Sequence, residues 1–460
     1  MPSAKAGIIP RLLHSSAFSR LPGDPLNEPS PARQPSTTVR PSACPGLLRI
    51  VQALDGGICR IKLAGGELQA DQADAIALAA ERHAGGVIEA TNRANLQIRG
   101  IGAQPQALID LLLAAGLGPR NAAADDVRNL MLSPTAGIDP HRLLDTRPLA
   151  AQILESLENE PRFAELSAKF ALLLDGGEAL AMQAHEHDLW LGALELDGQT
   201  WLAVGLAGCP GHAEYAVPLA QGHACVLAVL NLFLDLATPA QTRMRHLLNE
   251  MGADAFIARL PIVLHKGTFQ INAATGSPLG TYPQSQAGLV YVGAGAPLGR
   301  LDPAMLRGVA KLARDFGDGT LRMTPWQSVL LPTIKAADAS QVSAALHALG
   351  FVCDASEPLA AVIACTGSAG CAKGLSDTKA DAVRLAALRK GPGVSVHLTG
   401  CTRSCAAAHV APATLLAVSA GHYDLYLRDA GLPGFGRLCA RDLTLEAASA
   451  LLESCSRSNV

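Results

Sequence analysis

One stretch of the sequence occurs twice, and this duplication limits the possible folds more than any other feature. The segment GGELQADQADAIALAAERHAGGVIEATNRANLQI, from Gly65, matches GRLDPAMLRGVAKLARDFGDGTLRMTPWQSVLL, from Gly299. Equivalent residues stand 233 positions apart without a gap, as Leu68 and Leu301 do. Each copy predicts a strand, an amphipathic helix, a glycine turn and a second strand. Because short units of this kind cannot bury a core alone, we expect the two copies to pair.

The duplication continues into a loop that carries sulfur in only one copy. LSPTAGI, from Leu132, matches CTGSAGC, from Cys365, at the same offset. Leu132 and Ile138 thus stand where the second copy has Cys365 and Cys371. If these cysteines were merely small core residues, either copy could use either residue type. The asymmetry indicates that one half of a duplicated scaffold binds a cofactor and the other half has a different role.

Four cysteines form two closely spaced pairs, Cys365-x5-Cys371 and Cys401-x3-Cys405. Each pair follows a short β-like run, AAVIA or VSVHLT, so the thiols stand at strand ends. An iron–sulfur cluster needs four converging thiolates, and the glycines around them let backbone N–H groups approach sulfur. The x5 spacing lies outside the range of zinc knuckles, and neither pair has the Cys-x-x-Cys spacing of a redox dithiol. The spacing favours a cluster, and four unrelated thiols remain the alternative.

The composition bounds the class of protein and its partners. The 460 residues suggest roughly three domains of about 150 residues, and a hydrophobic content of 49% supplies their cores. A formal net charge of −3 gives no reason to expect nucleic acid or an anionic membrane as a partner. No apolar run reaches the roughly 18 residues of a membrane span. The nearest, CVLAVLNLFLDLA from Cys225, favours a buried helix.

The beginning of the chain is rich in proline, serine and arginine and shows no apolar periodicity. Asp24 and Glu28 argue against a transit peptide, so a flexible tail is the preferred interpretation. There is no secretory hydrophobic segment. We therefore expect a cytoplasmic protein whose 11 cysteines are mostly reduced, with any cysteine cluster serving a metal.

Three motifs carry a family resemblance: TNRANLQIRG from Thr91, DDVRNLMLSPTAGIDP from Asp125 and ELSAKFALLL from Glu165. In this order, and with the cysteine pattern, they resemble the sirohaem-type sulfite and nitrite reductases over nearly the whole chain. The resemblance implies an internally duplicated fold of mixed α+β and α/β class, with two ferredoxin-like half-domains paired pseudo-symmetrically beside two α/β domains. The implied segments are a tail (1–47), a first half-domain (48–118), a substrate-side α/β domain (119–240), a connecting segment (241–285), a second half-domain (286–350) and an α/β iron–sulfur domain (351–460).

The resemblance also implies roles for individual residues. The four cysteines would bind a 4Fe-4S cluster. Substrate would be bound by residues of the cysteine-free half: Arg93, Arg128, Lys169 and Asn129. A guanidinium can hold a carboxylate through two hydrogen bonds, whereas lysine acts as a point charge.

Less specific interpretations of the same residues stay open. Most charged side chains are solvated, or form a salt bridge, here with Asp125 or Asp126. The ordered motifs outweigh this alternative for Arg93 and Arg128, but not for Lys169. Thr91 and Gln97 are weaker candidates for polar support.

The departures from the reductase pattern point to one branch of the family. Ala168 and Ala171 replace two basic residues, and Ala94 replaces a glutamine. Fewer cations weaken the case for a small dianion such as sulfite, which needs dense positive charge. RPSACPGLLRI, around Cys44, and TNRANLQIRG are similar to the precorrin-3B synthases of aerobic cobalamin synthesis. By this analogy alone, Cys44 lines the site.

That branch implies oxygen-dependent hydroxylation and lactone formation on the tetrapyrrole precorrin-3A, with O2 and an external electron donor. It also implies a mononuclear non-haem iron. HEHD, from His185, is the densest histidine cluster, but its spacing is not decisive, so neither iron ligands nor catalytic residues are predicted. The alternatives are a sirohaem-dependent sulfite or nitrite reductase and a non-catalytic electron carrier. Sirohaem stays open because Cys405 matches the cysteine that bridges cluster and haem in the reductases.

Overall fold

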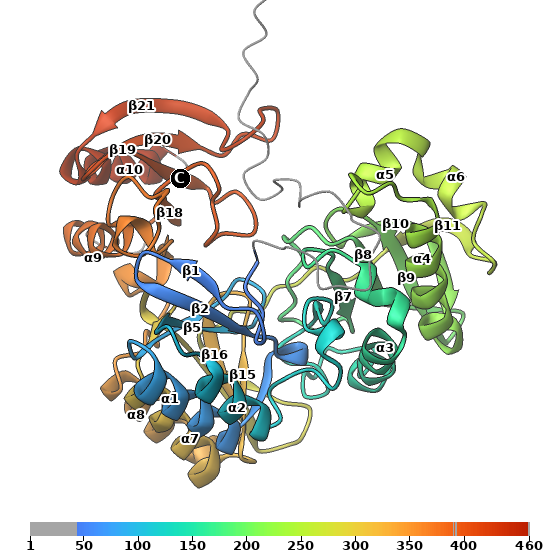
Figure 1. Cartoon of the computed structure of the whole chain (residues 1–460). Coiled ribbons are helices and arrows are strands. Elements are labelled where there is room, and N and C mark those ends of the chain that lie inside the picture. Colours follow the sequence, from blue (N-terminus) through green and yellow to red (C-terminus); the bar gives the residue numbers. More distant parts are fainter. Residues whose placement is uncertain (1–43, 390, 392, 459–460) are drawn as a thin grey trace, which may run out of the picture.

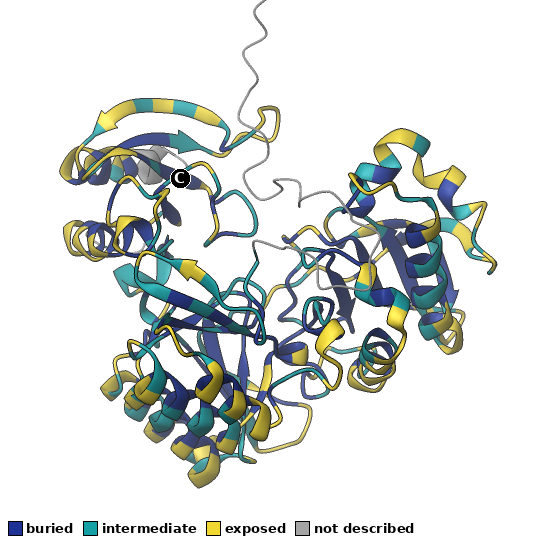
Figure 2. Ribbon diagram, in the orientation of Figure 1, coloured by how far each residue is buried: buried dark blue, intermediate teal, exposed yellow. Residues whose placement is uncertain are grey.

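The computed structural model describes residues 44–389, 391 and 393–458, so nearly all of the expected tail lies outside the described residues. Figure 1 shows three lobes, with the two half-domains packed together below and one α/β domain on either side above them. The inner strands are mostly buried, and the outer faces of the helices are exposed (Figure 2).

The two half-domains repeat one another element by element. The first contains β1 (Val51–Ala53), β2 (Gly56–Ile61), α1 (Ala70–His83), β4 (Val87–Ala90), β5 (Leu96–Ile101) and α2 (Gln106–Ala114). The second contains β12 (Gly280–Pro283), β13 (Leu289–Gly295), α7 (Pro303–Phe316), β15 (Thr320–Met323), β16 (Ser328–Lys335) and α8 (Ala339–Ala348). Both ends of α7 and of β15 stand 233 residues beyond those of α1 and β4, which confirms the repeat.

Each half-domain completes the sheet of the other. β3 (Glu67–Gln69) pairs antiparallel with β15, and Leu68 stands opposite Leu321. β14 (Arg300–Leu301) pairs in the same way with β4 of the first half. The two sheets therefore run β1-β2-β5-β4-β14 and β12-β13-β16-β15-β3. Because α1 also packs on α7, one apolar core contains buried residues of both halves, as the small size of each copy requires.

The two α/β domains also share one topology. The first contains β6 (Leu130–Leu132), β7 (Leu172–Asp175), β8 (Leu189–Leu196), β9 (Gln199–Leu206) and β10 (His212–Pro218), and the second contains β17 (Val362–Ala364), β18 (Val396–Thr399), β19 (Ala413–Ser419), β20 (His422–Leu427) and β21 (Arg437–Leu443). In each domain the first three strands are parallel and the others antiparallel. α3 (Arg147–Asn159) and α9 (Thr378–Leu388) follow the first strands, and α4 (Gly222–Leu236) and α10 (Leu445–Ser458) follow the last.

The stretch 241–285 is more than the connecting segment expected from its glycines and prolines. It contains α5 (Met244–Met251), α6 (Ala253–Ile257) and β11 (His265–Gln270), and it ends in β12. β11 pairs with the edge strand β10 and so extends the first α/β sheet. Hydrogen bonding to an existing sheet edge outweighs the weak strand propensity of this segment, which local sequence cannot reveal.

One apolar segment also differs from expectation. Among the described residues, Leu219–Leu236 has the length and composition of a membrane-spanning helix. The expectation that no run is long enough is therefore corrected. The apolar residues of α4 pack in the core of the first α/β domain, which explains their character: Cys225, Val226, Val229, Leu230, Phe233 and Leu234.

Replacing Leu68 with alanine tests the exchanged strand. The side chain is fully buried within the sheet of the other half, so its loss should lower the free energy of unfolding by about 2–5 kcal/mol. Denaturant unfolding measures this change. Leu432→Ala, at a residue 47% exposed, is the matched control and should change stability by less than about 0.5 kcal/mol. Equal effects of the two substitutions would contradict a structural role for the exchange.

Candidate active site

The two cysteine pairs meet at one edge of the second α/β sheet. Cys365 directly follows β17, and Cys401 follows the adjacent parallel strand β18. Ligands bind at such carboxyl edges in α/β sheets. Cys405 lies close enough to Cys365, Cys371 and Cys401 to interact with all three electrostatically. The structure thus brings together the four thiols that sequence analysis grouped.

Glycines make the close packing of these loops possible. The N–H of Gly400 donates to Cys365 Sγ at 3.2 Å. A Cβ on Gly400 would stand 3.0 Å from Gly374 Cα, and one on Gly374 would stand 2.5 Å from the carbonyl carbon of Gly367. Gly367 also has a φ of +66°, which favours glycine. Side chains here would push the loops apart, so the glycines hold the thiols together and let an N–H group reach sulfur.

Four neighbouring thiols can lose their protons together only beside positive charge. Burial raises the pKa of the Cys405 thiol to about 11, and the neighbouring thiols add to the shift. Metal coordination deprotonates thiols and removes this repulsion. Among the described residues, no three His, Cys, Asp or Glu side chains are placed to hold one metal ion. The donor set suits a larger cluster of iron and sulfide.

The sheet of the first half-domain contacts the first cysteine loop. Arg99 Nη2 donates to the carbonyl of Gly370 at 3.2 Å. Glu89 accepts a hydrogen bond from Thr366 Oγ1 at 3.3 Å and lies 3.8 Å from the Nζ of buried Lys379. Burial lowers the pKa of Lys379, and Glu89 opposes the shift. A buried cation beside the loop compensates negative charge on the thiolates.

Arg93 stands at the tip of the turn between β4 and β5. Thr91 Oγ1 holds this turn by accepting hydrogen bonds from the N–H groups of Arg93 at 3.3 Å and Asn95 at 3.1 Å. The neighbouring Asn92 Nδ2 donates to the carbonyl of Cys405 at 3.3 Å, across 313 positions of sequence. The turn therefore places Arg93 close to the second cysteine loop.

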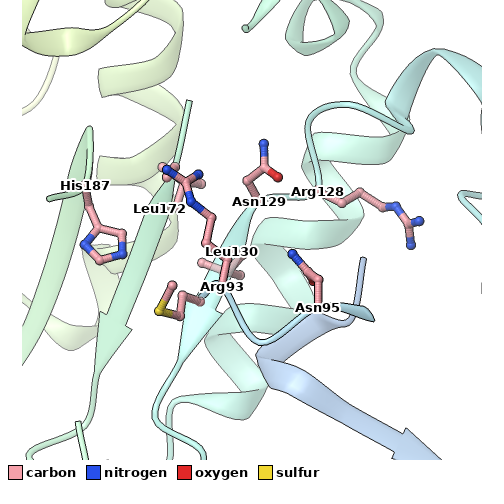
Figure 3. A pocket seen from close by; sticks show the side chains of 9 residues that line it. Arg93, Asn95, Arg128, Asn129, Leu130, Leu172 and His187 are labelled. Atoms are coloured by element: carbon pink, nitrogen blue, oxygen red, sulfur yellow. The ribbon is translucent and has the colours of Figure 1, made fainter. Parts of the chain in front are cut away.

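Arg93 lines a cavity of about 10 Å³, close to the space that one water molecule needs. Its lining is shown in Figure 3: Arg93, Asn95, Arg128, Asn129, Leu130, Met131, Ala171, Leu172 and His187. Burial lowers the pKa of Arg93 to about 10; Arg243 adds to the shift and Asp188 opposes it. Arg93 therefore stays charged at neutral pH, and no described residue hydrogen-bonds to its guanidinium. It is available to an anionic ligand.

Arg128 is oriented differently. Its guanidinium points away from Arg93 and His187 (Figure 3), and Nε lies 3.5 Å from Glu158 Oε1. Burial lowers the pKa of Arg128, and Glu158 opposes the shift. The salt bridge considered from sequence is thus formed, with Glu158 in place of Asp125 or Asp126.

The side chains of Asn129 and Lys169 are also not placed to bind a ligand in this cavity. Asn129 lines the cavity, but its Nδ2 donates to the carbonyls of Asp126 at 2.9 Å, Ala168 at 2.9 Å and Phe170 at 3.2 Å. Its amide therefore joins two chain segments. Lys169 is half-buried and is absent from the cavity lining, whereas Ala171 contributes to that lining. The methyl group of Ala171 stands where the resemblance leads one to expect a basic side chain.

Sequence reasoning missed two cations on β2 and directly after it. With the Gln97 amide oriented so that its oxygen faces Arg60, this oxygen accepts from Arg60 Nε at 2.9 Å and from Nη2 at 2.7 Å. Arg60 also interacts electrostatically with Cys44 and Cys405. Lys62 is buried, donates to the carbonyl of Asp126, and has its pKa lowered to about 7 by burial. The alternation of apolar and basic residues in ICRIKL was the available signal.

A duplicated ferredoxin-like core, joined to an α/β domain that holds four thiols beside buried cations, defines an iron–sulfur oxidoreductase. Residues 51–115 and 282–349 match the nitrite/sulfite reductase ferredoxin-like half domain, and residues 123–266 match the nitrite and sulphite reductase 4Fe-4S domain. The chain belongs to the nitrite/sulfite reductase family. The matched 4Fe-4S domain is the first α/β copy, and the four cysteines lie in the second copy of the same topology.

Individual relatives agree with this family. The chain is 31% identical to the chloroplastic ferredoxin–nitrite reductase of Zea mays, over 76% of this chain and 68% of the maize protein. It is 29% identical to a precorrin-3B synthase of Sinorhizobium sp, over 86% of this chain and 85% of that enzyme. The solved structure of the Mycobacterium tuberculosis NirA protein superposes with a TM-score of 0.71 at 21% identity, covering 87% of this chain and 80% of that chain. The fold implied by the resemblance is therefore confirmed.

Arg93 and Arg128 should respond differently to substitution by glutamine. Arg93→Gln should weaken binding of an anionic ligand by about 10–100-fold, because it removes an available charged donor. Arg128→Gln should lower the thermal midpoint and change affinity less, because Glu158 loses the nearer of its two arginine partners, Arg128 and Arg120. Titration with a carboxylated tetrapyrrole followed by absorbance, together with thermal unfolding, measures both effects. The opposite pattern would make Arg128 the ligand-binding arginine.

Proposed function

We propose that this protein is an iron–sulfur monooxygenase of the precorrin-3B synthase type. It hydroxylates precorrin-3A with O2 and closes a lactone, a step of aerobic cobalamin (vitamin B12) biosynthesis. The reduced thiols that such a cluster needs are consistent with a cytoplasmic location.

The charge of the cavity carries this proposal. The guanidinium of Arg93 is available to an anionic ligand, whereas Arg128 pairs with Glu158. Ala171 contributes a methyl group to the cavity where a reductase would be expected to have a cation. A small oxyanion needs several convergent cations, whereas a macrocycle with many carboxylates can use cations spread over a wider surface. Arg60 adds such a charge near Arg93, and Lys62 lies near Arg60 and Arg128. The lengths of the two proteins support the proposal as well. The match with the Sinorhizobium enzyme spans 86% of this chain and 85% of that enzyme.

The cluster would be held by Cys365, Cys371, Cys401 and Cys405, and when bound it supplies single-electron transfer from an external donor. Hydroxylation consumes O2, two electrons and two protons, inserts one oxygen atom into the substrate and releases one water. Arg93 binds a substrate carboxylate, and the turn held by Thr91 orients it. Arg99 and Lys379 hold the first cysteine loop in place by donating to the carbonyls of Gly370 and Ala364.

The second candidate is a sirohaem-dependent nitrite or sulfite reductase. The identity to the maize nitrite reductase favours it, as does the 29% identity to the ferredoxin–nitrite reductase of Synechococcus elongatus. It would use the same four cysteines for the cluster, with sirohaem beside Cys405. This candidate requires stoichiometric sirohaem and reduction of nitrite or sulfite.

Product analysis separates the two functions. The protein with a reconstituted cluster is given precorrin-3A, reductant and heavy-isotope O2, and the product mass is measured. Gain of one heavy oxygen atom is expected. Nitrite or sulfite reduction by a sirohaem-containing preparation, without oxygen transfer to precorrin-3A, would replace the proposal with the second candidate.

The cluster ligands are tested by Cys401→Ala. Loss of one of four thiolates should abolish the brown cluster absorbance and turnover. Cys439→Ala is the matched control because Cys439 is exposed and lies on β21 of the same domain, so it should keep both. A full cluster in the Cys401→Ala variant, counted as iron and sulfide per chain, would show that the ligand set is wrong.

A further inference from the structure

Four histidines from the two α/β domains lie one after another in space between the second cysteine loop and the Arg93 cavity. His187 lines the cavity, and His185 precedes it by two residues in the loop before β8. The ring of His185 lies 5.2 Å, centroid to centroid, from that of His409, which follows the second cysteine pair. His409 interacts electrostatically with His397 on β18. The contact between His185 and His409 joins domains that are distant in sequence.

Each of these imidazoles has a buried nitrogen to which no described residue hydrogen-bonds: Nδ1 of His185, His187 and His409, and Nε2 of His397. Buried polar atoms are normally paired, because leaving one unpaired costs about 1–3 kcal/mol. Four such atoms along one path indicate that something absent from the protein alone, such as bridging water, pairs with them. Among the described residues, no three of these side chains are placed to hold one metal ion.

We propose that His409, His185 and His187 form a proton relay into the Arg93 cavity. His409 is the half-buried member and receives protons from solvent. Each neutral imidazole has one donor and one acceptor nitrogen, so it accepts a proton on one side and releases another on the opposite side. His397 positions His409, and its own Nδ1 lies 3.4 Å from Ser404 Oγ, which joins the relay to the second cysteine loop.

Burial, together with nearby charges, keeps the imidazoles of the relay neutral. Arg93 and Arg243 face His187 and disfavour its protonation, while Asp188 favours it. Arg93 also faces His185, and Arg428 faces His409. Burial lowers the pKa of His187 to about 3, so protons pass through the relay without accumulating on it. Each turnover of either candidate function consumes protons in this cavity, so the relay does not depend on which of the two is correct.

The experiment compares His409→Ala, His185→Asn and the control His223→Ala in the full chain with its cluster. His223 lies on α4, where its Nε2 contacts Ser156 Oγ at 2.9 Å, away from the relay. Turnover is measured with precorrin-3A and, in parallel, with nitrite, using whichever substrate the unmodified protein converts. Conversion of nitrite alone would contradict the proposed function and still test the relay.

The relay predicts that kcat falls by about 10–100-fold in His409→Ala and His185→Asn, with KM and the cluster absorbance unchanged. Added imidazole should restore much of the lost rate, and the control should match the unmodified protein. Unchanged kcat, or a loss that imidazole does not restore, overturns the proposal. A metal ion beyond the cluster iron that both histidine variants lose would overturn it in favour of a metal site.

Discussion

The exchange of β3 and β14 between the half-domains is the constraint on which the rest of the structure depends. Each short strand supplies hydrogen bonds to the outer strand of the other half's sheet, so neither sheet is complete alone. This fixes the orientation of the two halves and therefore of the α/β domain that follows each of them. The Arg93 turn and the cysteine loops meet because this frame sets their positions. A site whose parts lie 313 positions apart in sequence needs such a frame.

The same frame shows how one scaffold acquired two roles. The turn at Thr91 recurs at Thr324, whose Oγ1 accepts from the N–H groups of Trp326 at 3.2 Å and Ser328 at 3.3 Å. Its tip carries Arg93 in the first copy and Trp326 in the second. In the loop after the first α/β strand, aliphatic residues likewise take the places of cysteines. Duplication conserved backbone geometry, while side chains at a few turn and loop positions determine the chemistry.

The sequence predicted the parts of the fold that depend on periodicity and on the repeat. The constant offset located α1 and α7 and matched Cys365 and Cys371 with Leu132 and Ile138, because an ungapped repeat keeps equivalent residues in equivalent places. The spacing within the two cysteine pairs grouped Cys365 with Cys401. It did not predict where side chains point. The motif that singled out Arg128 could not show that its guanidinium faces Glu158, nor that the amide of Asn129 binds three carbonyls. The exchanged strands and the approach of His185 to His409 also depend on tertiary packing, which local sequence does not encode.

Buried charge links the two halves of the site energetically. Lys62, Arg93 and Lys379 are cations whose pKa values are all lowered by burial, which means that folding places them where charge is disfavoured. Protein carboxylates compensate them only in part, since Glu89 lies 3.8 Å from Lys379 Nζ and Asp126 contributes a carbonyl to Lys62. Such an arrangement is stable when anions bind beside the cations. Thiolates of a cluster are anions of this kind, since Lys379 interacts electrostatically with Cys365 and Arg60 with Cys405.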